Sequence, residues 1–171
     1  LTQTWAYALE HGSRRHAAAA LANLATCYDG FGEFAEALAA LREALVELEA
    51  LIGPMHPSLA HVHINLGSVL VELGDHEAAR RHMAVVKQII SANYPGDHYM
   101  LVAATDILAL SYDRQERDEE ALAHYREALA MGERLDGPNS PDVASTLCNM
   151  AATLRAMHRF DEAVVASARG V

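Results

Sequence analysis

Apolar residues recur along the chain at helical spacing, and short segments rich in glycine, proline and aspartate separate the apolar stretches. Within residues 60–70, one helical face carries Val62, Leu66, Val69 and Leu70. Gly74 and Asp75 then suit the end of one helix and the start of the next. A second helix is predicted over residues 77–90, ending near the turn at 94–96. No stretch alternates apolar and polar residues with period two, so the pattern predicts helices and no strands.

This two-helix pattern repeats every 42 residues. Three strings stand in register: Asn23-Leu24-Ala25, Asn65-Leu66-Gly67 and Asn149-Met150-Ala151. One column on the predicted second helices is always alanine: Ala37, Ala79, Ala121 and Ala163. One column on the predicted first helices is always large and apolar: Tyr28, Leu70, Tyr112 and Leu154. A single helix pair cannot bury its apolar face, so the repeat predicts an all-α solenoid of stacked, antiparallel helix pairs.

The composition narrows the functions open to such a chain. Thirteen Lys and Arg residues against 23 Asp and Glu give the 171-residue chain a formal charge of −10, and Lys87 is its one lysine. Phosphate backbones require clustered cations, so nucleic-acid binding is excluded. No apolar run reaches the ~18 residues of a membrane span. The two cysteines, Cys27 and Cys148, form no paired motif, which indicates a reducing, cytoplasmic compartment.

The sequence carries no motif for catalysis or for a cofactor. It has no GxSxG, GxxxxGK[ST] or GxGxxG string, and its glycines concentrate at the predicted turns. Ten histidines suggest metal binding, but none forms a His-x3-His or His-Glu-x-x-His pair. His61 and His63 point to different faces of one helix. We therefore expect a protein that is not an enzyme and holds neither a metal nor a cofactor.

The order of the small, leucine and aromatic positions resembles the tetratricopeptide repeat. In the first copy, the family's signature positions are Leu24, Ala25, Tyr28, Gly32, Ala37 and Ala44. The long period and the Gly-Pro linkers are similar to the 42-residue kinesin-light-chain subtype. The arginine-rich, lysine-poor composition suggests a bacterial source. The resemblance implies a right-handed superhelix. The sequence departs from the family's residue pattern at His63, Thr105, Ile107 and the turn positions Glu116 and His158.

In this register the chain forms a single solenoid of repeats. Residues 1–12 align with the tail of a preceding repeat, and full repeats follow at 18–59, 60–101 and 102–143. Residues 144–171 form a truncated fourth repeat. We therefore expect a slice of a longer array.

The resemblance also implies which residues line the concave groove: Asn23, Thr26, His61, Ile64, Asn65, Ser68, Asp106, Ile107, Leu110 and Asn149. An asparagine amide both donates and accepts, so it can pair with a peptide main chain of any sequence. The apolar members would hold an apolar side chain of the peptide. The same asparagines could instead bond a neighbouring helix and fix the repeat angle, and the residues alone leave both roles open.

We expect a non-catalytic scaffold that binds a protein or peptide segment of basic or neutral character in this groove, without nucleic acid or membrane. The alternative is a regulatory or sensor segment of a larger multidomain signalling enzyme, such as a bacterial Ser/Thr kinase. Self-association through exposed repeat ends is a third interpretation.

Overall fold

The computed structural model describes residues 32–170, which form helices joined by short turns and contain no β-strand. The helices are α3 (Phe34–Ile52), α4 (Leu59–Glu72), α5 (His76–Asn93), α6 (Tyr99–Asp113), α7 (Asp118–Asp136), α8 (Pro141–Ala156) and α9 (Phe160–Arg169). The helical prediction is confirmed for this part of the chain. The predictions for Asn23, Thr26 and the partial repeat 1–12 lie outside the described residues.

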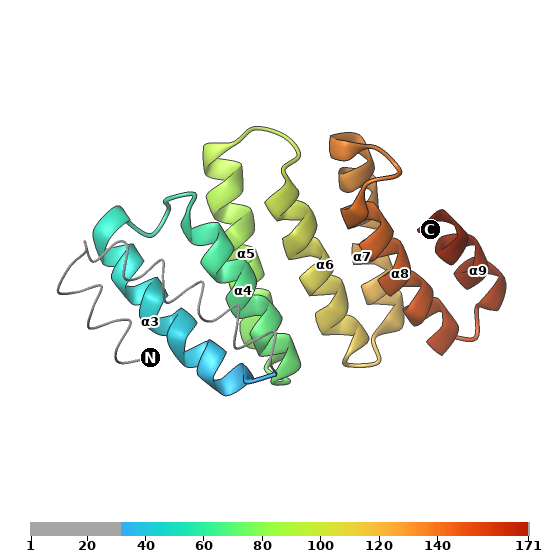
Figure 1. Ribbon diagram of the computed structural model, residues 1–171, viewed down its shortest axis with the longest axis horizontal. Helices are drawn as coiled ribbons and strands as arrows, with labels where there is room; N and C mark the ends of the chain where they lie inside the picture. The colour runs from blue at the N-terminus through green and yellow to red at the C-terminus, as the bar shows by residue number, and fades with distance from the viewer. Residues whose placement is uncertain (1–31, 171) are drawn as a thin grey trace.

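The helices stand side by side in chain order from α3 to α9, each antiparallel to the next (Figure 1). Each packs against its neighbour in sequence, so α4 and α5, α6 and α7, and α8 and α9 form pairs that stack on one another. We call α4, α6 and α8 the first helices, and α3, α5, α7 and α9 the second helices. The architecture is the predicted all-α solenoid.

Two helices begin at the capping residues that the sequence suggests. Asp75 caps α5, because its carboxylate accepts a hydrogen bond from the Ala78 amide at 3.1 Å. Ser140 caps α8 through a bond from the Val143 amide at 3.3 Å, and Pro141 occupies the first turn, where its missing N–H leaves no bond unmade. These two caps fix where α5 and α8 begin, and thereby which residues share the buried face of each.

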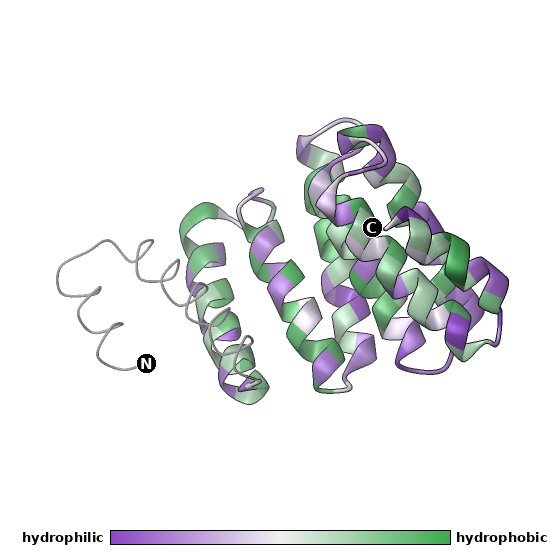
Figure 2. Cartoon of the chain, turned by 45° about the vertical axis from the view of Figure 1, so that its right-hand side comes forward, coloured by the Kyte–Doolittle hydropathy of each residue, from purple (hydrophilic) through white to green (hydrophobic). Residues whose placement is uncertain are grey.

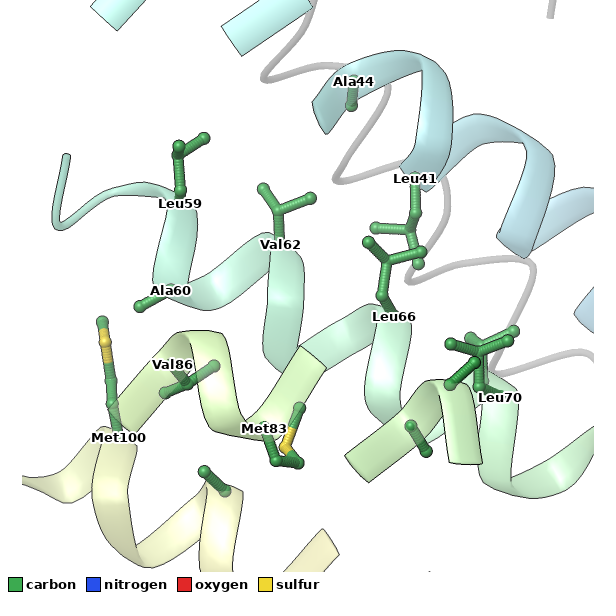
Figure 3. Packing of buried hydrophobic residues seen from close by; sticks show 14 of the residues in the cluster. Leu41, Ala44, Leu59, Ala60, Val62, Leu66, Leu70, Met83, Val86 and Met100 are labelled. Carbon is green, nitrogen blue, oxygen red and sulfur yellow. The ribbon is translucent and has the colours of Figure 1, made fainter. Parts of the chain in front are cut away.

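Apolar side chains from successive helices interlock along the stack. Leu41 of α3 and Leu66 of α4 face one another, and both are fully buried (Figure 3). The alanine column of the second helices is also buried. At Gly67 of α4, an added methyl group would overlap the flexible end of the Met83 side chain of α5 and lie 3.4 Å from Ile107 of α6. Small residues therefore allow the close helix approach on which the stack depends.

Each helix carries hydrophilic and hydrophobic stretches side by side, as Figure 2 shows. This amphipathic pattern is typical of helices that bury one face against neighbours and leave the other in water. Within residues 32–170, no helix is both long enough and apolar enough to cross a membrane.

Candidate functional site

The first helices lie on the inner side of the stack. The backbones of α4 and α6, and of α6 and α8, approach closely, whereas the backbones of the second helices among residues 32–170 stand farther apart and are bridged by side chains, as in the ion pair of Lys87 with Glu127. In a curved stack, the helices on the concave side approach most closely. The exposed side of α4, α6 and α8 therefore forms one continuous surface, which we call the inner face.

On α4, the predicted groove residues differ in exposure. His61 is exposed, whereas Ile64, Asn65 and Ser68 are half-buried. The Nε2 atom of His61 lies 3.3 Å from the hydroxyl of Tyr99, the first residue of α6. Tyr99 was not among the predicted groove residues, because it precedes the first-helix positions that the family pattern assigns to the inner face. Tyr99 adds an aromatic ring beside His61 on this surface.

On α6, Asp106 faces the junction with α8. Its Oδ2 accepts a hydrogen bond of 2.8 Å from the hydroxyl of Thr146, while its Oδ1 is buried and has no hydrogen-bond partner among residues 32–170. Burial raises the pKa of Asp106 to about 6, the Thr146 bond opposes this rise, and the charge of Asp142 adds to it. Asp106 thus links two first helices in addition to carrying charge on the inner face.

The same link recurs two helical turns along the junction. Asp113 Oδ1 accepts a bond of 2.6 Å from the hydroxyl of Thr153. Each threonine lies 40 residues after its aspartate, and its single hydroxyl hydrogen is shared between that carboxylate and a carbonyl of its own helix, that of Asp142 or Asn149. The two threonines were missed in the sequence analysis, although two Asp–Thr pairs at one spacing were a signal that could have been read.

The remaining predicted residues lie at different depths. Ile107 and Leu110 of α6 are half-buried and pack against the core, so only part of each side chain is available to a ligand. Asn149 of α8 is exposed. The structure thus gathers residues of three successive first helices on one surface, with polar side chains beside partly covered apolar ones.

His63 lies on the other side of α4 from His61, as its spacing predicted. It is buried against α5, and its Nδ1 lies 2.8 Å from Nδ1 of His82. Burial lowers the pKa of His63 to about 4, with a further contribution from the nearby His82 ring. Burial also lowers the pKa of His82, helped by Arg42 and Arg81 and opposed by Asp75. The pair is therefore uncharged at neutral pH, with His63 buried and His82 half-buried.

No group of three or more His, Cys, Asp or Glu side chains within residues 32–170 is arranged to hold a metal ion. Cys148, the one cysteine in this part of the chain, is free and exposed on α8. Cys27 lies outside the described residues.

These features define a class of protein: helical-repeat solenoids whose stacked first helices present an extended surface. The model of the tetratricopeptide repeat family matches residues 17–89 and 93–169, which is most of the sequence. The chain belongs to the tetratricopeptide repeat family. Such repeats generally act as protein–protein interaction scaffolds, and proteins built from them are generally non-catalytic.

Solved structures of kinesin-light-chain-like proteins share the fold. BtubC (BKLC) from P. vanneervenii is 24% identical with a TM-score of 0.75, and the match covers 92% of this chain and 62% of that one. A kinesin-light-chain-like protein of Podosopora anserina with nearly identical TPR-like repeats is 18% identical with a TM-score of 0.70, covering 97% and 80%. The chain thus spans less than two thirds of BtubC. No curated protein sequence matches it.

Proposed function

We propose that this chain is a non-catalytic scaffold whose inner face binds an extended segment of a partner protein. The observation that best supports this proposal is that the inner face is continuous, since α4 packs on α6 and α6 on α8. A partner segment lying across them would meet three helices without leaving the surface. Rigid, packed helices lose little entropy on binding, which favours recognition by a preformed surface.

The side chains on this face support a partner of basic or neutral character. Asp106 and Asp113 lie on α6, and the whole chain carries a formal charge of −10. His61 and Asn149 are exposed and offer donors and acceptors, while the partly covered Ile64 and Leu110 offer apolar contact. A segment that alternates apolar and polar or basic side chains would satisfy both kinds of contact.

The test uses peptides selected from a random displayed library against the whole chain, with affinities measured by fluorescence anisotropy. We expect the double variant Asn65→Ala/Asn149→Ala to bind the selected peptides at least tenfold more weakly. Asn139→Ala, in the exposed loop before α8, is the matched control and should bind like the parent. Unchanged affinity together with a lowered melting temperature would favour the structural role of the asparagines and would contradict the proposal.

Other predictions remain proposals beside this one. The repeat limits at 60, 102 and 144, the cytoplasmic location, self-association and the regulatory role within a larger signalling enzyme rest on the sequence pattern alone. The full reading frame would decide the regulatory alternative, since a kinase-type glycine-rich loop and catalytic loop upstream would favour it.

A further inference from the structure

The outer side of the stack differs from the inner face because the backbones of successive second helices stand apart. Ion pairs bridge them, Lys87–Glu127 between α5 and α7 and Arg169–Glu133 between α7 and α9. Between two successive second helices lies a gap on the outer side, and the first helix between them forms the bottom of this gap. Between α3 and α5, the ring of His82 occupies this space, against His63 and near Arg42 of α3. The ring centroids of the two histidines are 5.1 Å apart. The first of these gaps is therefore filled by rings that the chain itself supplies.

The next gap, between α5 and α7, is also filled by rings. Tyr112 of α6 stacks on His124 of α7, with centroids 5.3 Å apart and an interplanar angle of 11°. Two guanidinium groups lie over the same tyrosine, that of Arg117 at 4.6 Å and that of Arg80 at 5.2 Å from the ring centroid. In this gap, therefore, an aromatic ring packs beside the buried Ala109 and Ala121 and under two cations.

The third gap, between α7 and α9, lacks both rings. One step of 42 residues takes Tyr112 to Leu154 and His124 to Ala166. Both replacements are smaller, and a cavity of about 320 Å³ lies at this position. Its lining includes Met150 and Leu154 of α8 and Val165 and Ala166 of α9. We call this cavity the outer groove. Its volume is at the lower end of the ~300–1,000 Å³ range of ligand pockets.

Charged side chains also line the outer groove. They are Asp161, Glu162 and Arg169 of α9, of which Arg169 pairs with Glu133 of α7, and Arg126 of α7. Arg126 is exposed and makes no hydrogen bond or ion pair with another residue in the 32–170 range beyond a longer-range attraction to Glu162. Arg126 lies 84 residues after Arg42, the arginine near the His82 ring in the first gap. The outer groove thus retains apolar side chains at its bottom and a cation but not the ring.

We propose that the outer groove between α7 and α9 binds an aromatic side chain from a partner protein. The ring would lie on Leu154 and Ala166, with the Arg126 guanidinium over its face, as Tyr112 lies with Arg80 and Arg117 in the preceding gap. This site faces away from the inner face and does not depend on the function proposed for it.

The probe is N-acetyl-L-tryptophanamide, titrated into the isotope-labelled whole chain and followed by amide chemical shifts. We expect saturable shifts centred on Met150, Val165 and Ala166, and at least threefold weaker binding of N-acetyl-L-leucinamide. Arg126→Gln should weaken the tryptophan probe about 2–5-fold, which is the range of an exposed cation–π contact. Arg81→Gln, an exposed arginine on α5 remote from the groove, is the matched control and should have no effect.

Two variants refill the groove with the residues of the preceding gap. Leu154→Tyr and Ala166→His lie on different helices, and each should abolish the shifts, so the test survives if one of them fails to fold. Equal binding of the leucine and tryptophan probes would overturn the proposal. So would shifts that map to the exposed Phe160 and Val164 on the far side of α9, or binding that both refilled variants retain.

Discussion

Glu116 and His158, which lie 42 residues apart, hold the same left-handed backbone conformation, with φ of 57° and 59°. One further step back is Gly74 with φ of 80°, and the step before that is Gly32 with φ of 76°. Gly74, Glu116 and His158 each lie in the turn between the first and second helix of a pair, and Gly32 lies just before α3. The turn geometry is therefore kept when the glycine that suits it is lost, and the backbone at Glu116 and His158 is strained.

Replacing either strained residue by glycine should stabilise the protein. We expect Glu116→Gly and His158→Gly each to raise the free energy of unfolding by about 0.5–1 kcal/mol, since relief of strain exceeds the added entropy of the unfolded chain. Both side chains are exposed, so little packing is lost. Urea denaturation measures the change. Gly74→Ala should act in the opposite direction, and a loss of stability on introducing glycine would show that the turn is not strained.

The His63–His82 pair should make stability depend on pH. The pKa of His63 is lowered to about 4 in the folded chain, whereas in the unfolded chain it returns to about 6.5. Between these values the unfolded state binds more protons, so the free energy of unfolding falls as the pH is lowered from 6.5 to 4. The contribution lost is about 1–3 kcal/mol.

The variant His63→Leu isolates this effect, because Leu147 occupies the corresponding position in the fourth repeat and is fully buried there. Denaturation curves at intervals between pH 4 and pH 8 should show a flatter profile for the variant than for the parent. Parallel profiles for the two proteins would mean that the His63–His82 contact contributes nothing to acid sensitivity.

Asp106 should make the free energy of unfolding depend on pH in the opposite direction. Its pKa is raised to about 6, so between pH 4 and pH 6 the folded state binds more protons than the unfolded state. Stability linked to this group is present at acid pH and is lost as the pH rises through 6. We expect Asp106→Asn to raise the free energy of unfolding by about 1 kcal/mol at pH 7.5 and to change it little at pH 4.5, as a neutral amide is easier to bury.

Thr146→Val provides the converse measurement for Asp106. It removes the hydroxyl that donates to Oδ2 and should lower stability at pH 7.5 by about 1–2 kcal/mol, because the buried carboxylate then loses this hydrogen bond. Equal effects of Asp106→Asn at both pH values would show that its carboxylate is not perturbed.

The repeat and the local capping residues were enough to predict the helix pairs and two of the helix starts. The 42-residue period located the helix pairs, and the caps at Asp75 and Ser140 were identified because their chemistry is local. The contacts between repeats were not predicted. The bond from Thr146 to Asp106 joins two repeats, and the contact of His63 with His82, which joins the two helices of one repeat, was not predicted either. Both depend on which helix faces which, and on rotamers that a sequence pattern does not specify. The depth of Ile107 and Leu110 likewise follows from how closely α4 and α6 pack.

The alanine column allows a last test of the packing itself. Ala121 of α7 is fully buried against Ala109 and Tyr125, whereas Ala123, two residues later, is exposed on the same helix. Ala121→Leu adds three carbon atoms at a close helix contact and should lower the free energy of unfolding by about 1–3 kcal/mol. Ala123→Leu adds the same atoms in water and should change it by less than about 0.5 kcal/mol. Equal effects in thermal denaturation would mean that helix propensity, and not the close approach of α6 and α7, selects alanine in this column.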